Sequence, residues 1–295
     1  MAEPTSRRTT RSDRRIPGWA ASLLTRFARE RPPVITRRDI EAVLTETGLH
    51  RDADGTLREL QRLGWLVPTH LKGAWAYLPP GEDVVTDPYV DLRAWRARDR
   101  DAVFALAGEA AAWHLGYLDR AFAGPTAVWI PNVRRLPHGL RRHLSVVRLG
   151  WRADDADELG PSPLLLHRRH LDLTRWSAGL PAFGPEALVV QLAKRPSSFR
   201  AWTGLIDHLH LLAGDCDPTR LSGLLRGQSS SAWQRSAYLL TRGDQRAVAE
   251  EVFARRPAGP LPKVQLGTGP NTMWDGEFKV SDALIAPTQQ TMGKA

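Results

Sequence analysis

The chain has 295 residues, of which 42% are hydrophobic and 25% are charged, and these globular proportions exclude a wholly disordered chain and a coiled coil. No apolar run approaches the roughly 20 residues of a membrane span, and no signal core follows the basic N-terminus. The single cysteine, Cys216, excludes a disulfide framework and multi-cysteine metal sites. We therefore expect a soluble cytoplasmic protein.

The charge favours a polyanionic partner, since 41 Lys and Arg outnumber 32 Asp and Glu and give a net charge of +9. Arg far outnumbers Lys, which coding bias in a GC-rich genome would also produce. The distribution of the charges along the chain decides between a polyanionic partner and coding bias. Residues 1–80 carry 14 basic and 9 acidic residues, a net +5, whereas the other 215 residues carry +4. The charge density is therefore highest near the N-terminus, which favours nucleic acid.

Residues 1–15 are the first expected segment, a flexible basic arm. It holds five arginines among small polar residues and nothing apolar enough to pack. Such an arm either lies in a DNA groove or is a solvated tail, and the sequence favours neither interpretation.

Residues 16–80 begin with two expected helices. Leu23, Leu24 and Phe27 have helical spacing, and two prolines at 32 and 33 end that helix. Thr36 and Asp39 form a pair like a capping box, which predicts the start of a second helix. That helix ends at a glycine, residue 48.

A third helix and a hairpin complete this segment. Periodic apolar residues predict a helix over about residues 51–63, ended by Gly64. The β-prone runs 65–69 and 74–78 flank a turn that contains Lys72 and Gly73, which indicates a hairpin. Three helices followed by a hairpin are the layout of a winged helix-turn-helix DNA-binding domain.

The third helix is predicted to carry an arginine stripe opposite its apolar stripe. With Leu57 at 0° and a turn of about 100° per residue, Leu60 lies at about 300°. Arg58 and Arg62 then lie at about 100° and 140°, on the opposite face. Arginine can bond guanine O6 and N7 bidentately, so this face suits the major groove of DNA. On an arbitrary amphipathic helix, outward arginines are more often simply solvated.

Other basic residues of this segment are candidates for supporting contacts. Arg51 and Gly55 join the arginine stripe if the helix starts early enough, and Gly55 would let the backbone approach DNA closely. Arg37 and Arg38 lie in the first turn of the preceding helix, where that element crosses the phosphate backbone. Lys72, in the hairpin turn, is the expected wing contact to a phosphate or the minor groove.

Residues 81–295 are expected to form a larger mixed α/β domain, so the predicted fold class is α+β. Helices are expected within 91–123 and over 185–193, 199–213, 218–226 and 231–240. Strands are expected over 127–130, 144–147 and 164–166, and a small hairpin pairs 263–266 with 277–280.

A basic cluster without acidic residues runs from residue 134 to 148 of this domain. Its candidate DNA-binding residues are Arg134, Arg135, Arg141 and Arg142. With two further arginines at 168 and 169, the cluster either extends a phosphate-tracking surface, or docks an acidic or nucleic-acid-containing partner, or is plain surface.

Motifs of catalysis are largely missing, because the chain has no Gly-rich phosphate loop, nucleophile elbow or HExxH sequence. His167 with His170, and Asp207 with His208, are the only candidates for metal chemistry in the sequence. The plainer interpretation is a basic surface strip for the first pair and the polar face of a core helix for the second. Cys216 lies between two aspartates, which disfavour a thiolate nucleophile. We expect no catalytic residue, no metal and no cofactor. The alternative is a metal-dependent nucleic-acid-processing enzyme targeted by the winged module.

The chain resembles the AbiEi family, the antitoxins of bacterial abortive-infection (type IV) toxin–antitoxin systems, in particular its mycobacterial type. The resemblance rests on RRDIEAVL, TLRELQRLGWLVP and AWAYLPPGE in the first domain, and on TAVWIP, LSVVRL and SSSAWQRSAYLL in the second. It covers about residues 17–280, and its specificity lies in the combination and order of these sequences.

The resemblance implies a transcriptional regulator that is not an enzyme. The winged domain would bind operator inverted repeats in double-stranded DNA and repress its own operon. The larger domain would counteract a nucleotidyltransferase-like toxin, with or without a stable complex, and no membrane is involved. A third possibility is a protein-binding module whose winged domain docks the toxin.

Overall fold

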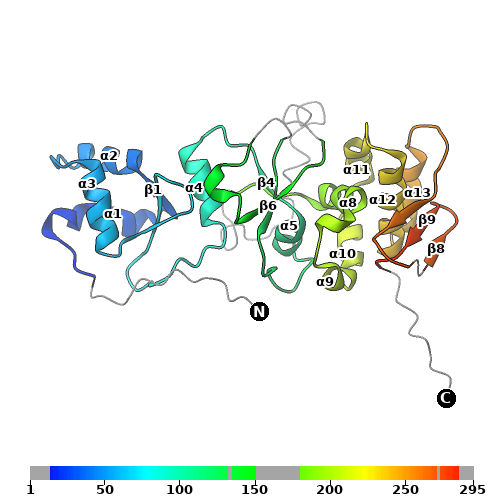
Figure 1. Ribbon diagram of the computed structural model, residues 1–295, viewed down its shortest axis with the longest axis horizontal. Helices are drawn as coiled ribbons and strands as arrows, with labels where there is room; N and C mark the ends of the chain where they lie inside the picture. The colour runs from blue at the N-terminus through cyan, green and yellow to red at the C-terminus, as the bar shows by residue number, and fades with distance from the viewer. Residues whose placement is uncertain (1–13, 132–134, 151–179, 271–272, 286–295) are drawn as a thin grey trace, which may run out of the picture. The chain divides into compact units, whose positions relative to one another are not determined.

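Figure 1 shows a computed structural model, which describes residues 14–131, 135–150, 180–270 and 273–285. Contacts within the described chain divide it into two compact units. The first unit comprises the residues up to Ala102 together with Leu136–His143, and the second comprises Val103–Arg135 and the residues from Leu144 on. Helices and small sheets occur together in the chain, so the predicted α+β class is confirmed.

The first unit contains the helices and the hairpin that the sequence predicts, in the predicted order. Its elements are η1 (Gly18–Ala20), α1 (Ala21–Glu30), β1 (Val34–Thr36), α2 (Arg37–Glu46), α3 (Ala53–Arg62), β2 (Leu66–Pro68), β3 (Ala74–Tyr77), α4 (Val90–Arg98) and η2 (His138–Leu140). The sequence did not predict β1 or η2, and it placed α4 only within a broad helical region.

Side-chain caps explain why α2 and α3 begin where they do. Thr36 Oγ1 accepts a hydrogen bond from the backbone N–H of Asp39, whose carboxylate accepts one from the N–H of Thr36, so the capping box is present. The Asp52 carboxylate accepts from the N–H of Gly55 at 2.6 Å. α3 therefore begins directly after Asp52, later than predicted, and it is followed by Gly64 at φ 79°.

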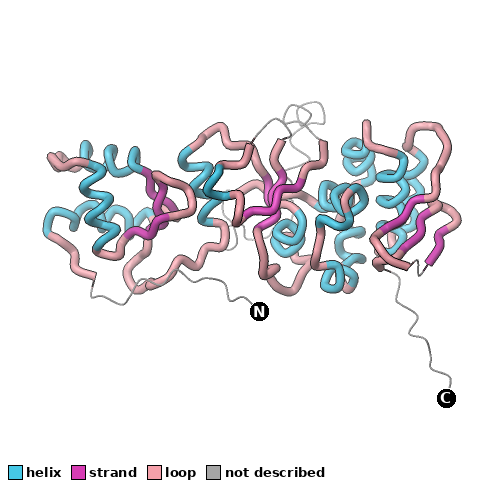
Figure 2. The backbone as a smooth tube through the Cα atoms, viewed as in Figure 1, coloured by secondary structure: helices cyan, strands magenta, loops and turns pink. Residues whose placement is uncertain are grey.

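The strands of the first unit, drawn in magenta in Figure 2, form a sheet. Its order is β1-β3-β2, and both pairings are antiparallel. Successive strand residues point to opposite sides of the sheet, and apolar side chains pack on both faces. Leu66 packs into the cluster formed with α1, α2 and α3, whereas the next residue, Val67, packs with Ala76 and Val90 on the other face. α4 packs on β1 and β3, so this unit extends beyond residue 80.

The second unit is built mainly of helices around one large apolar core. Its elements are β4 (Ala105–Leu106), α5 (Gly108–His114), β5 (Thr126–Trp129), β6 (Leu144–Val147), α8 (Pro185–Lys194), η4 (Pro196–Ser198), α9 (Trp202–Ile206), α10 (Leu209–Gly214), α11 (Pro218–Leu225), α12 (Ser230–Arg242), α13 (Arg246–Ala254), β7 (Val264–Leu266), β8 (Met273–Asp275) and β9 (Val280–Asp282). None of the helices described in either unit is long and apolar enough to cross a membrane.

Several predicted elements of this unit differ in detail. The expected helix 199–213 is two helices, because His208 leaves the helical conformation at φ −113° and ψ 10°. The expected hairpin of 263–266 with 277–280 is wrong: β7 and β9 pair in parallel, and β8 pairs antiparallel with β9. Parallel strands need a crossover connection rather than a tight turn, and β8 lies within that connection. The predicted strand 164–166 lies outside the described residues.

Candidate nucleic-acid interface

α3 has one buried and one basic face, as its periodicity predicts. Its buried residues are Ala53, Thr56, Leu57 and Leu60. Arg58 and Arg62 are exposed, and neither guanidinium makes an ion pair or hydrogen bond with any residue in the part of the chain that the structure describes. Both side chains can therefore reach a ligand without first breaking a contact.

The acidic residues beside this stripe are neutralised by arginines from outside α3. Asp54 lies 3.5 Å from Arg37 Nη1, and Glu59 lies 2.7 Å from Arg51 Nη2. The guanidinium of Arg51 also stacks over the Trp19 ring, 3.9 Å from its centroid. The charge of α3 that remains uncompensated is therefore positive.

Arg37 lies in the first turn of α2, as the sequence predicts, but the ion pairs of Arg37 and Arg51 were not predicted. Arg51 precedes Asp52, the N-cap of α3, so it is not part of the helical stripe. Arg37 is 57% exposed and pairs with Glu41 at 2.8 Å as well as with Asp54. Exposed ion pairs of this kind contribute only about 0–1 kcal/mol, so a phosphate could still displace the carboxylates from Arg37.

Gly55 has a structural role within α3. Its N–H caps onto Asp52, and a Cβ at this position would lie 3.2 Å from Asp52 Oδ2. That contact is tight enough to require movement of the capping carboxylate. The sequence suggested glycine here because the backbone would approach DNA closely. The contact with Asp52 gives a second reason, which lies within the helix itself.

Arg38 and the start of α2 present a mixed environment. Arg38 is exposed and has no hydrogen bond or ion pair among the described residues. The carboxylate of Asp39 lies in the same first turn, and the N–H of Asp39 is already bonded to Thr36. The N-terminus of α2 is therefore occupied by a negative charge, and a phosphate here would depend on the Arg38 guanidinium.

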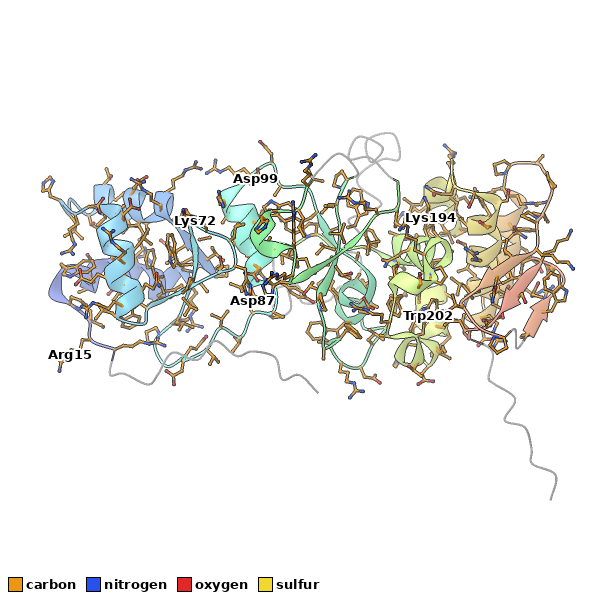
Figure 3. All side chains as sticks on the ribbon, viewed as in Figure 1. Arg15, Lys72, Asp87, Asp99, Lys194 and Trp202 are labelled. Carbon is orange, nitrogen blue, oxygen red and sulfur yellow. The ribbon has the colours of Figure 1, made fainter. Side chains whose placement is uncertain are left out.

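The turn between β2 and β3 presents Lys72 on a braced loop (Figure 3). Thr69 Oγ1 donates to the Ala74 carbonyl at 2.9 Å, and Gly73 adopts φ 84°. Arg98 Nη1, from α4, donates to the Lys72 carbonyl at 3.0 Å. Sequence reasoning missed Arg98, because only the packing of α4 on the sheet brings it to this turn.

α3 is also tied to the hairpin through a residue that the sequence analysis did not select. Gln61 is exposed on α3, and its Oε1 accepts a hydrogen bond of 3.2 Å from Trp75 Nε1 on β3. The contact links the helix to the strand. Gln61 carries no motif signal, since a single polar residue at an outward position is ordinary.

The basic cluster of residues 134–148 is divided between the two units. Arg134 lies outside the described residues, and the exposed Arg135 belongs to the second unit. Arg141 and Arg142 are exposed as well, but their segment, Leu136–His143, belongs to the first unit. Two of the four arginines that the sequence assigned to the larger domain therefore belong to the unit that contains α3.

The candidate metal residues do not gather into a site in the described chain. Asp207 is exposed, and the ring nitrogens of His208 contact the Gly204 carbonyl at 3.1 Å and Asp119 Oδ1 at 3.3 Å. Within the described ranges, no group of three or more His, Cys, Asp or Glu side chains is placed to hold a metal ion. His167 and His170 lie outside these ranges, as do the arginines at 168 and 169.

Comparison with known proteins places this architecture in a family. A model of the AbiEi antitoxin C-terminal domain matches residues 102–242. The chain is similar to the RV2827C protein from Mycobacterium tuberculosis, known from a crystal structure, with 48% identity and a TM-score of 0.82. That likeness covers 96% of this chain and 97% of the other. No curated protein matches. As the sequence resemblance predicts, the chain belongs to the AbiEi antitoxin family.

Proposed function

We propose that this protein is a sequence-specific repressor that binds operator inverted repeats in double-stranded DNA, controls its own toxin–antitoxin operon and counteracts a nucleotidyltransferase-like toxin. Membership of an antitoxin family supports the antitoxin role. The DNA-binding role is supported by the first unit, whose helices, hairpin and basic surface suit a winged helix-turn-helix.

One observation carries the DNA-binding proposal. Arg58 and Arg62 project from one exposed face of α3, while both neighbouring acids are paired elsewhere. A helix with its side chains is about 10–12 Å across, which fits a major groove about 12 Å wide. In that groove the two guanidinium groups would read base edges, with guanine O6 and N7 as their natural partners.

Other cations of the first unit would hold the phosphate backbone. Arg38 and Lys72 are exposed and have no ion pair among the described residues, so they bind phosphates without losing an existing partner. Arg37 and Arg51 would each have to give up a carboxylate first. We therefore assign the main phosphate contacts to Arg38 and Lys72, and minor contributions to Arg37 and Arg51.

The substitution Arg58→Ala tests base reading. The probe is a duplex from the promoter upstream of the gene, compared with a scrambled duplex of the same base composition, in a fluorescence anisotropy titration. We expect the affinity for the promoter duplex to fall by about 1–3 kcal/mol, or about 5- to 150-fold, because a bidentate base contact is lost. The affinity for the scrambled duplex should change much less.

Arg29→Ala is the matched control, because Arg29 is 79% exposed on α1 and its loss removes the same charge. This variant should bind both duplexes like the wild type. An equal loss of affinity on both duplexes in Arg58→Ala would show that Arg58 only contacts a phosphate. Failure of the wild type to prefer the promoter duplex would overturn the proposed repressor function.

A further inference from the structure

The segment Leu136–His143 forms a compact turn with one apolar and one basic side. The N–H of Leu140 donates to the Pro137 carbonyl, and the N–H of His143 donates to the Leu140 carbonyl, both at 3.0 Å. Leu136 and Leu140 are buried, whereas His138, Gly139 and Arg141–His143 are exposed. The segment therefore packs through its leucines and presents its basic residues outward.

The turn packs directly against the loop between β2 and β3. The imidazole of His143 stacks on that of His70 with the ring centroids 3.3 Å apart and the planes 18° from parallel. Gly139 lies against the backbone of the same residue, since a Cβ added there would be 2.0 Å from the His70 carbonyl oxygen. Only glycine permits this approach, because a backbone carbonyl cannot rotate away as the end of a side chain can.

His70 is itself held from the other side by α4. Its backbone N–H donates to Asp91 Oδ1 at 2.9 Å, and its Nδ1 lies 2.5 Å from Asp91 Oδ2. Both oxygens of this carboxylate are thus engaged by one residue. The Asp91 carboxylate therefore holds His70 in position, and His70 in turn contacts the turn through His143.

The outward residues of the turn extend the positive surface of the loop. Arg141 and Arg142 immediately precede the stacked His143, and Lys72 follows His70 by two positions. The Arg98 guanidinium is bonded to the Lys72 carbonyl. Three cationic side chains thus come from a turn and a loop that are in contact, although they are far apart in the sequence, and Arg98 of α4 adds a fourth beside Lys72.

We propose that Leu136–His143 is a second wing, which binds the phosphate backbone of the duplex through Arg141 and Arg142 beside the Lys72 loop. The inference rests on the proposed function, since it assumes that α3 engages DNA. A phosphate partner fits better than a protein partner because the exposed part of the segment is entirely polar or glycine, whereas protein interfaces need a buried apolar centre. Guanidinium groups also match phosphate oxygens bidentately.

The double substitution Arg141→Ala/Arg142→Ala tests the second wing. Each phosphate contact contributes about 0.9 to the slope of log Kobs against log salt. Loss of two contacts should therefore reduce the slope by about 1.8, so that the ratio of affinities at 50 and 200 mM salt falls about tenfold. The preference for promoter over scrambled duplex should remain, because phosphates carry no base identity. Arg195→Ala/Arg226→Ala, two exposed arginines of the second unit, is the charge-matched control.

A second variant, Gly139→Ala, separates the position of the segment from its charge. The added Cβ should detach the segment from His70 while both arginines remain, so the salt slope should fall as in the double variant. Trypsin should then cleave more rapidly after Arg141 or Arg142, and this readout needs no DNA. Gly18→Ala is the matched control, because a Cβ at Gly18 meets no atom within 4 Å.

The outcomes distinguish the two proposals. A double variant with the wild-type slope overturns the second wing and leaves the function of α3 intact. Faster tryptic cleavage of Gly139→Ala with an unchanged slope also overturns it, because detachment would then have no effect on DNA. If the wild type binds no duplex at any salt concentration, the proposed function and the second wing fail together.

Discussion

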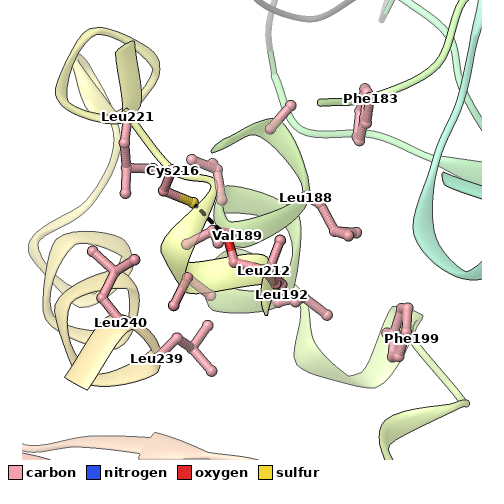
Figure 4. Close-up of a cluster of buried hydrophobic side chains, with 14 of the residues drawn as sticks. Phe183, Leu188, Val189, Leu192, Phe199, Leu212, Cys216, Leu221, Leu239 and Leu240 are labelled. Atoms are coloured by element: carbon pink, nitrogen blue, oxygen red, sulfur yellow. Dashed lines mark hydrogen bonds between the residues drawn. The ribbon is translucent and has the colours of Figure 1, made fainter. Parts of the chain in front are cut away.

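Cys216 illustrates at the residue scale how burial and charge together suppress a reactive group. The thiol is 6% exposed and donates to the Leu212 carbonyl at 3.3 Å (Figure 4). Burial raises its pKa well above the ordinary value, and the carboxylates of Glu186, Asp215 and Asp217 raise it further. The sequence predicted only the effect of the two adjacent aspartates.

We therefore expect Cys216 to resist alkylation in the native protein. Iodoacetamide reacts with thiolates, and a raised pKa leaves almost no thiolate at neutral pH, while burial blocks access. Mass spectrometry should find the folded protein unmodified, including after moderate alkaline treatment, because the pH must exceed the raised pKa before thiolate forms. Full modification should follow unfolding in urea. Modification of the folded protein at the rate of a free thiol would contradict this account.

Arg58 and Arg37 show what residue-level reasoning from the sequence can and cannot provide. The outward direction of Arg58 follows from helical periodicity alone, and the structure agrees with it. The pairing of Arg37 with Asp54 depends on how α2 packs against α3, so no local pattern contains it. The same holds for Arg51, whose partners Trp19 and Glu59 come from two different elements.

At the scale of elements, α12 acts as a clamp for the C-terminal sheet. Gln234, which is fully buried, donates from Nε2 to the carbonyls of Pro262 and Phe278 at 2.8 and 2.7 Å. One turn further, the hydroxyl of Tyr238 donates to Asp282 on β9 at 2.7 Å. These bonds join the helix to the residue pair before β7, to the connection between β8 and β9, and to β9 itself.

The substitution Gln234→Leu should destabilise this unit by about 1–3 kcal/mol, because it leaves the buried Phe278 carbonyl without this donor, whereas the carbonyl of the exposed Pro262 can bind water. Urea denaturation followed by tryptophan fluorescence measures the change in the free energy of unfolding. Gln265→Leu is the matched control, since Gln265 is exposed on β7 and surface changes usually cost less than about 0.5 kcal/mol. Equal stability of the two variants would show that the clamp contributes little.

Elements with strong local signals were predicted well, and those that depend on tertiary pairing were not. The capping box at Thr36 and the glycine after α3 are read directly from neighbouring residues, and the boundaries of α2 and α3 follow within a few positions. β1 is only three residues long and exists because β3 pairs with it. The parallel pairing of β7 with β9 also could not be predicted, because turn residues in the sequence indicate only antiparallel hairpins.

At the scale of the whole molecule, the family match and the candidate DNA-binding helix fall on different stretches of chain. The antitoxin domain match covers residues 102–242, most of which belong to the second unit, whereas α3 belongs to the first. We therefore propose that promoter repression and toxin neutralisation depend on different surfaces and can be separated by single substitutions.

Arg58→Ala should lose repression of a promoter reporter and keep full protection against the toxin that we propose this protein counteracts. The reason is that Arg58 is exposed on α3 and lies outside the matched antitoxin domain. Reporter activity and growth during toxin induction are measured in the same cells. Arg29→Ala should keep both activities. A parallel loss of repression and protection in Arg58→Ala would contradict the separation of surfaces.

The division into units also explains why the sequence analysis assigned Arg141 and Arg142 to the larger domain, although the structure has them in the first unit. Arg141 and Arg142 were grouped with their chain neighbours, because a linear pattern cannot show that His143 stacks on His70. Gly139 belongs to no recognisable sequence motif either. Glycine is required there only because the position lies against the His70 carbonyl oxygen.

The first unit is assembled from two stretches of chain, one ending at Ala102 and the other spanning Leu136–His143. During translation, the ribosome must therefore add about forty residues after Ala102 before the stacking partner of His70 has been synthesised. At about 5–20 residues per second, that interval lasts a few seconds. A newly made protein thus completes the packing of the first unit only after the first stretch of the second unit, Val103–Arg135, has been synthesised.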